Sequence, residues 1–372
     1  MCSSDLNRLL LDLEAPEQAD QLREELAKVG DFGTVLLHEA LPGPDRAWVK
    51  GPGGHYLAEL VVPLVRRPRG DSPPEELPTR SDNARLTASV ASPLTRSRPP
   101  GSDWLFVKIY CPAPFEEELL VGAIRDFCHE VCSAGVSNGW FYLRYSDPDS
   151  HIRIRFRGDP QRLVTKLLPE VCSWCADLMA EGLCQRFCFD TYDREIERYG
   201  GPAGMAAAEA IFTSDSPAVV DLLALMRVTP DLDRLMATIA SIDDLLAAAG
   251  LSEMQRLAWY ADRVSRHSGG DEFRQRKSVL RPVLGRANGI ISLPGGEAFA
   301  RILAQRRRSL GPAAARLVEL EERGELTKSR DAILHSIVHL HCNRVAGNDW
   351  GLEERALGVL LRTCRSLKEA PL

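Results

Sequence analysis

The feature of the sequence that most limits the possible folds is the order of strand-like and helix-like stretches between residues 104 and 195. The alternating apolar run "DWLFVKIYCP" predicts a buried strand. After it come an amphipathic helical pattern, two strand-like runs, a second helical pattern and the strand-like "CQRFCFDTYDRE". The two helical patterns cover residues 115–134 and 160–181, and a turn at Asp147-Pro148-Asp149 joins the two middle runs into a hairpin.

This order of strand, helix, strand, strand, helix, strand predicts an α+β fold with a mixed or antiparallel sheet of ferredoxin-like type. From Ala203 to the end the pattern is nearly all helical, with breaks at "TSDSP", "RVTPDLD", "AAAGLSE", "HSGGDE" and "SLPGG". We therefore expect a sheet-containing half followed by a mostly helical C-terminal half.

Three segments are expected along the 372-residue chain. Residues 1–65 begin with a helical stretch over 6–29 and continue with strand-like runs around a turn-rich connection, which predicts a small N-terminal β-containing appendage. Residues 66–100 contain seven prolines and almost no large apolar side chain, as a linker does. Residues 101–372 form the main domain.

Charge and hydropathy exclude several classes of protein. The net charge of −6 and the isoelectric point near 5.8 argue against a protein that wraps nucleic acid, and we expect the basic run Arg306–Arg308 to form a solvated helix face. The N-terminus lacks the pattern of a signal peptide, and no apolar run approaches the roughly 18 to 20 residues of a membrane span. We expect a cytoplasmic protein that does not bind membranes and whose ten cysteines are reduced.

Two short cysteine pairs, Cys172/Cys175 and Cys184/Cys188, have a spacing that a zinc site could use. Zinc knuckles need turn-rich loops at each pair, whereas "LLPEVCSWCADLMAEGL" has the pattern of an amphipathic helix with Cys172, Cys175 and Met179 on its apolar side. We therefore interpret these cysteines as core residues and expect no metal.

The stretch "HIRIRF" at residues 151–156 alternates basic and apolar side chains. In a strand, His151, Arg153 and Arg155 lie on one face, with neighbours about 6.5 Å apart. Such a row is either a solvated strand face or a set of donors that converge on a small anion.

Two further polar clusters could carry chemistry. In "DTYDREIERYGG", Arg194 and Arg198 are four residues apart and Glu195 and Arg198 three apart, so on a helical turn each pair lies on one face; an ordinary surface ion pair has the same spacing. In "HSIVHLHCNR", His335 and His339 have a spacing that can hold a metal or place an imidazole in a cleft, although core histidines also occur there. The motifs GxGxxG, GxxxxGK[ST], GxSxG and HExxH are absent from the sequence, and we expect no cofactor.

Four segments together resemble a known family. In this order over about residues 101–368, "WLFVKIY", "GWFYLRYSDPDSHIRIRF", "DTYDREIERYGG" and "IVHLHCNRVAG" resemble the C-terminal glutamate-elimination domain of class I lanthipeptide dehydratases, which also occurs as a stand-alone protein in thiopeptide biosynthesis. Residues 1–65 resemble the tail of the preceding glutamylation domain.

The resemblance implies a β-elimination in which glutamate leaves a glutamylated serine or threonine of a precursor peptide, giving dehydroalanine or dehydrobutyrine. It implies catalytic roles for Arg153, Arg155, Glu195, Arg198 and His339; Arg194 and His151 are added as substrate-binding residues. The expected partners are the glutamylated precursor peptide and a separate glutamylating subunit, with no direct tRNA binding and with a homodimer as an option.

Two alternatives stay open. The related pyridine synthases of thiopeptide pathways join two dehydroalanines by a formal [4+2] addition, and we expect them to have lost the arginine, glutamate and histidine set that this sequence keeps. A non-catalytic scaffold of the dehydratase complex would bind the peptide or recruit the glutamylating subunit, and pathway output would then not depend on Arg155 or His339.

Overall fold

The computed structural model describes residues 16, 19–20, 49–51, 54–56, 93–146, 149–264, 268–285, 289–347, 349 and 351–369. The chain divides into two compact units, Met1–Asn83 and Ala84–Leu372. In the first unit, strands β1 (Val49–Gly51) and β2 (Gly54–Tyr56) form an antiparallel pair, in agreement with a small β-containing N-terminal segment. The helical stretch expected over residues 6–29 lies outside the described residues, except for residues 16, 19 and 20. Residues 66–92 of the expected linker also lie outside them.

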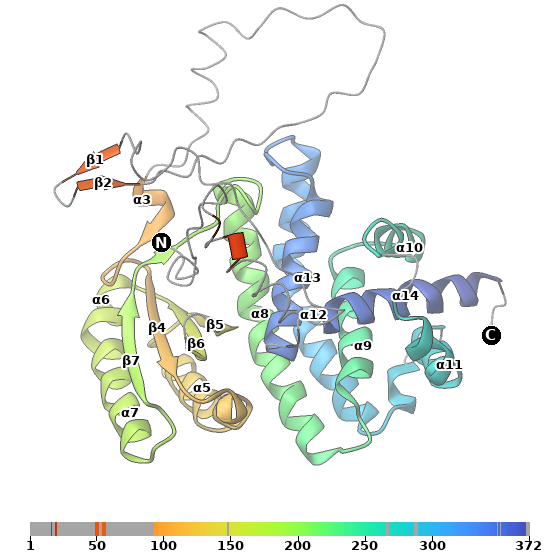
Figure 1. Cartoon of the computed structure of the whole chain (residues 1–372), viewed down its shortest axis with the longest axis horizontal. Coiled ribbons are helices and arrows are strands. Elements are labelled where there is room, and N and C mark those ends of the chain that lie inside the picture. Colours follow the sequence, from red (N-terminus) through yellow and green to blue (C-terminus); the bar gives the residue numbers. More distant parts are fainter. Residues whose placement is uncertain are drawn as a thin grey trace, which may run out of the picture. The chain divides into compact units, whose positions relative to one another are not determined.

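The second unit is built on a four-stranded antiparallel sheet (Figure 1). Its strands are β4 (Trp104–Tyr110), β5 (Gly139–Tyr145), β6 (His151–Arg157) and β7 (Arg186–Asp190). Their order in the sheet is β5-β6-β4-β7, and every neighbouring pair is antiparallel. This is the ferredoxin-like order, so the predicted α+β fold class is confirmed.

Two helical segments cover the apolar face of this sheet (Figure 1). The first runs from α4 (Glu116–Leu119) through a π-helical turn, Leu120–Ile124, into α5 (Arg125–Ser133). The second runs from α6 (Pro160–Arg162) through a π-helical turn, Leu163–Leu167, into α7 (Leu168–Ala180). Phe127 of α5 meets Phe156 of β6 edge-on at 6.2 Å and stacks on Trp174 of α7 at 4.3 Å. The apolar residues of "HIRIRF" therefore point into this layer, and its basic residues point to the opposite face.

Side chains from two later helices satisfy the outer edge of β5. The backbone N–H of Tyr142 donates to Ser216 Oγ on α8 (Pro202–Val228) at 3.2 Å. The side chain of Asn343 on α13 (Arg330–Ala346) accepts from the N–H of Arg144 and donates to its C=O, both at 2.9 Å. Because an open edge strand leaves backbone groups unpaired, these contacts dock the helical half on the sheet in one register.

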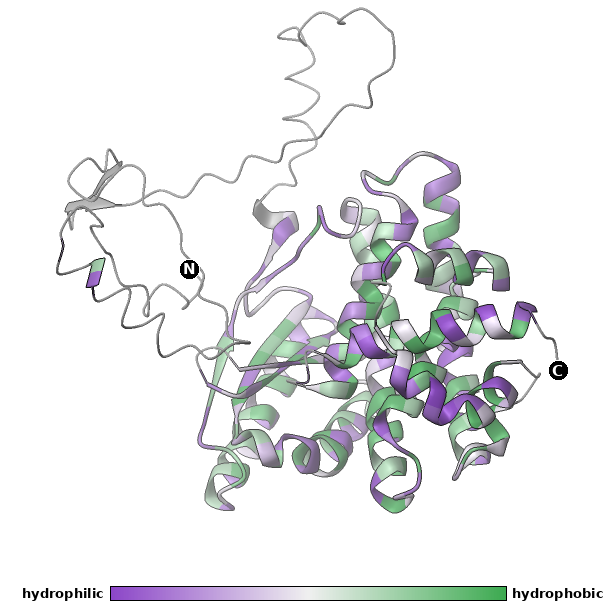
Figure 2. Cartoon of the chain, turned by 45° about the vertical axis from the view of Figure 1, so that its right-hand side comes forward, coloured by the Kyte–Doolittle hydropathy of each residue, from purple (hydrophilic) through white to green (hydrophobic). Residues whose placement is uncertain are grey.

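The remaining helices complete the predicted helical half. They are α9 (Arg234–Ala248), α10 (Glu253–Ala261), α11 (Gly270–Gly285), α12 (Gly296–Glu322) and α14 (Leu352–Glu369), with a 3-10 turn at Gly289–Ser292. Asp233, Ser252 and Ser329 cap α9, α10 and α13 through side-chain oxygens that accept backbone N–H groups. Figure 2 shows hydrophobic and hydrophilic residues alternating along the helices and strands of this unit. In the part of the chain that the structure describes, none of the helices has the length and apolar character of a membrane span.

A short segment before residue 101 belongs to the second unit. Helix α3 (Pro93–Arg96) leads into β3 (Ser97–Arg98), which pairs antiparallel with β8 (Tyr192–Asp193). The end of the range expected to be a linker is therefore ordered against the turn that follows the sheet.

The expectation that Arg306–Arg308 form a solvated helix face is wrong for Arg306, which is 1% exposed. Its Nη1 donates to Asp215 Oδ1 at 2.9 Å, and its Nη2 donates to Asp244 Oδ2 at 2.9 Å. Asp215 also accepts from His341 Nδ1 at 2.9 Å and from Arg344 Nη1 at 3.1 Å. We call Asp215, Asp244, Arg306, His341 and Arg344 the buried charge cluster; it joins α8, α9, α12 and α13.

The cysteine-bearing helix α7 also differs in part from its expected pattern. Cys175 and Cys184 are buried, as expected for core residues, whereas Cys188 of β7 is exposed and the expectation is wrong for it. Cys172 and Met179, which were placed on the apolar side, are exposed. The buried face of α7 is formed by Val171, Cys175 and Leu178, and Cys172 and Met179 lie beside this face. The apolar stripe is therefore narrower than the sequence suggested.

Candidate functional site

A cavity of about 500 Å³ lies where the basic face of the sheet meets the turn after β8 and the helices α8 and α13. All five residues expected to be catalytic line it: Arg153, Arg155, Glu195, Arg198 and His339. The structure therefore brings these five residues, which are distant in the sequence, to one cavity. The other lining side chains are mostly aromatic or apolar, and include Phe141, Tyr145, Tyr192, Tyr199 and Phe212.

Arg155 lines this cavity inside a cage of aromatic rings. Its guanidinium carbon lies 4.3 Å from the ring centre of Phe106, 5.2 Å from that of Phe141 and 4.6 Å from that of Tyr192. The residue is 7% exposed, and its Nε and Nη1 have no hydrogen-bond partner among the described residues. Burial lowers the pKa of Arg155, which remains a cation because a guanidinium does not lose its proton at physiological pH. A buried cation with unused donors in a cavity is suited to bind an anion.

Arg153 is oriented by two neighbours. Its guanidinium lies 3.4 Å over the ring centre of Tyr145, and its Nε donates to His151 Nε2 at 2.9 Å. His151 donates from Nδ1 to the carbonyl oxygen of Asp149 at 2.7 Å, which fixes the neutral tautomer. Burial lowers the pKa of His151, with the nearby cations acting in the same direction. His151 does not line the cavity, so the structure places it behind Arg153 rather than at the expected position beside a substrate.

The turn at residues 195–199 brings Glu195 and Arg198 to the cavity. Arg198 Nη1 donates to the Glu195 carboxylate at 3.2 Å, as the spacing predicted, and Arg198 Nε donates to Ser336 Oγ on α13 at 3.2 Å. Gly200 and Gly201 follow with φ of +78° and +104°, which favour glycine. A Cβ at Gly200 would also lie 2.8 Å from Ile333 Cδ1, so the two glycines let the turn approach α13.

Arg194 points away from the cavity, and the expectation that it shares a face with Arg198 is wrong. Its Nε and Nη2 donate to the two carboxylate oxygens of Glu209 on α8 at 2.7 and 2.6 Å. Both partners are buried. The segment is an irregular turn and not a helix, so a four-residue spacing does not align the two side chains. Arg194 holds the turn against α8 and does not line the cavity, where a substrate contact was expected.

His339 enters the cavity from α13 with a carboxylate behind it. Its Nδ1 donates to Glu353 Oε2 on α14 at 2.8 Å, which leaves Nε2 as the acceptor nitrogen. The side chain is 40% exposed, so Nε2 can exchange protons with a ligand. The sequence did not identify Glu353, because a contact between consecutive helices leaves no spacing signal; its position in the acidic first turn of α14 was the only indication.

The other two histidines of "HSIVHLHCNR" do not join the cavity. His335 is exposed and accepts from Arg263 Nε at 3.2 Å, whereas His341 belongs to the buried charge cluster. Within the described ranges, no three His, Cys, Asp or Glu side chains gather in a way that could hold a metal ion.

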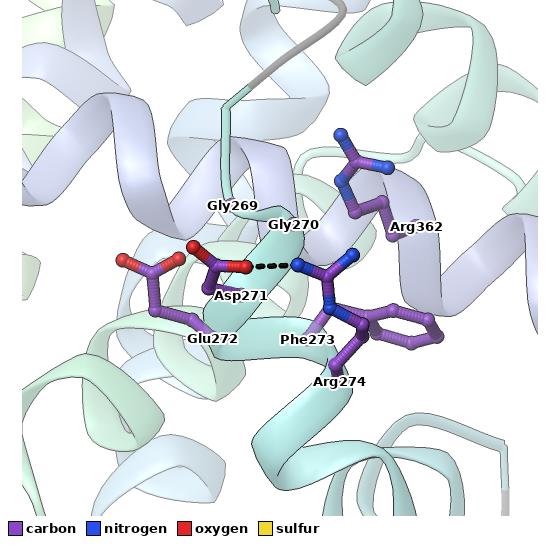
Figure 3. Close-up of a pocket in the computed structure, with 7 residues that line it drawn as sticks. All are labelled: Gly269, Gly270, Asp271, Glu272, Phe273, Arg274 and Arg362. Atoms are coloured by element: carbon purple, nitrogen blue, oxygen red, sulfur yellow. Dashed lines mark hydrogen bonds and ion pairs between the residues drawn. The ribbon is translucent and has the colours of Figure 1, made fainter.

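A second hollow lies at the N-terminus of α11 (Figure 3). Gly269 and Gly270 open the helix, and Arg274 points to Asp271, with which it forms an ion pair. Arg362 of α14 lines the same hollow and donates from Nε to the carbonyl oxygen of Ser268 at 3.1 Å. None of the residues predicted to be functional lines this hollow.

In comparisons with known proteins, one family model covers the whole range from which the cavity residues come. The family described as "Lantibiotic biosynthesis dehydratase C-term" matches residues 104–364. The subtilin biosynthesis protein SpaB of Bacillus subtilis is 30% identical over 360 residues, which are 94% of this chain and 33% of SpaB. The nisin biosynthesis protein NisB of Lactococcus lactis subsp. lactis is 30% identical over 181 residues, which are 48% of this chain and 17% of NisB. The chain thus spans a third or less of the length of these relatives.

Two solved structures share the fold. The tRNA-dependent lantibiotic dehydratase MibB from Microbispora sp. 107891 superposes with a TM-score of 0.65 and 23% identity, over 76% of this chain and 29% of MibB. The pyridine synthase TbtD from thiomuracin biosynthesis superposes with a TM-score of 0.53 and 15% identity, over 72% of this chain and 99% of TbtD. Likeness of fold does not choose between the reactions that these titles name.

Proposed function

The chain belongs to the family described as "Lantibiotic biosynthesis dehydratase C-term", and we propose that its cavity eliminates glutamate from glutamylated serine or threonine residues of a precursor peptide. The product is dehydroalanine or dehydrobutyrine, and the protein acts as a lyase that needs no added cofactor. A separate glutamylating subunit supplies the glutamylated peptide. This proposal extends the resemblance of "HIRIRF", "REIERYGG" and "HLHCNR" to the geometry of the site.

The observation that carries the proposal is the buried Arg155, whose Nε and Nη1 have no partner among the described residues. The leaving group is an anion with two carboxyl groups, one of which forms as the ester breaks. Guanidinium groups bind carboxylates with two parallel hydrogen bonds, and Arg153 and Arg198 line the same cavity. These cations favour both the bound glutamyl group and its departure.

In the proposed reaction, His339 Nε2 accepts the proton from Cα of the glutamylated residue. The electrons of the Cα–H bond pass through the amide enolate and form the Cα–Cβ double bond. The Cβ–O bond breaks, and glutamate leaves with the oxygen and the electron pair. Glu353 stabilises the imidazolium that forms, because its carboxylate accepts from Nδ1 at 2.8 Å.

The experiment uses the purified protein and a peptide that carries a glutamyl ester on serine, without tRNA. We expect loss of one glutamic acid per ester in the mass spectrum of the peptide. Arg155→Lys keeps the charge but loses the planar fork, and we expect an elimination rate at least about tenfold lower. Arg274→Lys is the matched control, because Arg274 lies exposed on α11 away from the cavity, and its rate should equal that of the wild type.

The alternatives give different results. Persistence of the ester with wild-type protein contradicts the proposed elimination. A scaffold predicts full pathway output from Arg155→Ala and His339→Ala in a reconstituted pathway, where an elimination enzyme accumulates glutamylated peptide. A pyridine synthase predicts no change in the ester and a macrocycle when a peptide with two dehydroalanines is supplied.

A further inference from the structure

Tyr199 carries a buried hydroxyl that the proposed reaction does not yet use. The residue follows Arg198 in the turn, is 1% exposed and lines the cavity. Its ring packs edge-on against Phe212 of α8 at 5.4 Å, which fixes the ring. Its Oη has no hydrogen-bond partner among the described residues.

This hydroxyl differs from those of buried tyrosines elsewhere in the fold. Tyr260 donates to Asp243 Oδ1 at 2.8 Å, and Tyr142 donates to the carbonyl oxygen of Arg344 at 3.2 Å. A buried hydroxyl without a partner costs free energy, so native proteins rarely keep one without a reason. Because Tyr199 lines a cavity, a ligand can supply the missing acceptor.

The surroundings of Tyr199 favour a neutral donor. Burial raises the pKa of Tyr199, so the phenol keeps its proton at physiological pH. Arg198 precedes Tyr199 in the chain. The guanidinium carbon of Arg344 lies 5.2 Å from the ring centre of Phe212, on which Tyr199 packs. Both cations favour negative charge on an oxygen placed near the hydroxyl, and the Glu195 carboxylate acts in the opposite direction.

We propose that the Tyr199 hydroxyl donates a hydrogen bond to a substrate oxygen that carries or gains negative charge in the cavity. This inference rests on the proposed elimination and adds a catalytic residue to it. The acceptor that we expect is the amide oxygen of the residue that loses its Cα proton. Tyr199 keeps its own proton, and the electron pair continues to the Cα–Cβ bond as glutamate leaves.

A neutral donor suits this acceptor better than it suits the glutamyl carboxylate. The arginines already present bind a permanent carboxylate in the substrate as tightly as in the transition state, which does not by itself raise the catalytic rate. A neutral hydroxyl forms an ordinary hydrogen bond with the ground-state amide and a stronger one with the enolate. The Tyr199 hydroxyl is therefore assigned to the developing charge.

The test compares Tyr199→Phe with the wild type and with Tyr260→Phe. In Tyr199→Phe we expect kcat for elimination to fall by about a hundredfold to a thousandfold with KM within about twofold. Its thermal midpoint should not fall, because the lost hydroxyl made no bond within the protein. Tyr260→Phe should show the reverse, a lower thermal midpoint and an unchanged kcat, because its hydroxyl bonds Asp243 far from the cavity.

A second measurement titrates L-glutamate into wild-type protein and Tyr199→Phe by calorimetry. Weaker glutamate binding and a higher KM in Tyr199→Phe, with kcat unchanged, would support the donor but assign its acceptor to the glutamyl carboxylate. Unchanged kcat, KM and glutamate affinity would overturn the inference. If wild-type protein eliminates nothing, the proposed function fails. Equal glutamate affinities of wild-type protein and Tyr199→Phe would then overturn the inference as well, whereas weaker binding by Tyr199→Phe would keep the donor with the glutamate carboxylate as its acceptor.

Discussion

Replacement of Asp215 by asparagine tests how the cavity is held, because this carboxylate is the centre of the buried charge cluster. Asp215 is 1% exposed and accepts from His341, Arg306 and Arg344. Burial alone would raise the pKa of Asp215, but contacts with His341 and the two arginines outweigh it and hold the pKa well below its usual value. Asp215 is therefore a carboxylate at neutral pH, and Asp215→Asn removes one negative charge without changing the shape of the side chain.

The magnitude follows from what remains around the two arginines. Arg306 keeps Asp244 Oδ2 and the hydroxyl and carbonyl oxygens of Ser241, all within 2.9 Å. Arg344 donates only from Nη1, to Asp215, since its Nε and Nη2 have no partner among the described residues. One buried cation is left without a counter-ion, which costs about 3–5 kcal/mol of unfolding free energy. With a urea m-value of about 3 kcal/mol per M, the midpoint should fall by about 1–1.7 M.

The assay is urea unfolding at pH 7, followed by circular dichroism. Asp271→Asn is the control, because the exposed pair Asp271–Arg274 should leave the midpoint unchanged. The double variant Asp215→Asn, Arg344→Met should recover part of the loss, since it removes the uncompensated cation as well. A loss under about 1 kcal/mol in Asp215→Asn, or a double variant less stable than the single one, would refute the reasoning.

Three further predictions follow from the site and its supports. Glu353→Gln should lower kcat for elimination by about tenfold or more without lowering the thermal midpoint, because the amide can hold His339 in the wrong tautomer; an unchanged kcat contradicts the assignment of Glu353. Asn343→Ala should cost about 2 kcal/mol in urea unfolding, because it leaves the backbone N–H and C=O of Arg144 unpaired, and a neutral effect would show that β5 is not held there. The free energy of unfolding should decrease as pH falls below about 6.5, because the pKa of His341 is lower in the folded than in the unfolded chain and the unfolded state binds the proton first. Urea midpoints that stay constant from pH 8 to 5.5 would contradict this prediction.

The sequence was most informative where the regular spacing of polar and apolar residues defines the two faces of a strand. In "HIRIRF" the alternation placed Arg153 and Arg155 on one side of a strand, and the register of β6 against β4 and β5 keeps them there. The order of strands and helices was sufficient for the ferredoxin-like sheet, because few topologies satisfy it. Local pattern therefore predicted which side chains share a surface.

Partners far apart in the sequence were beyond such reasoning. In "QRRRS" one of three consecutive arginines must turn inward on a packed helix, but the acceptor that makes this possible, Asp215, lies 91 residues earlier. The partner of Arg194 is Glu209, 15 residues later on α8, and this pairing turned the arginine away from the cavity. A buried charge is placed by its counter-ion, and the counter-ion comes from tertiary structure.

The cavity exists only when the sheet and the helical half are docked together. Arg153 and Arg155 come from β6, whereas His339 comes from α13, on the other side of the β5 edge. Asn343 holds that edge one helical turn after His339, and Ser336, one turn before it, accepts from Arg198 at 3.2 Å. The contacts that position α13 thus lie on both sides of the histidine. We conclude that α13 is both the support of the sheet edge and the carrier of the proposed base, so a shift of this helix would displace His339 and open the edge of β5 in the same step.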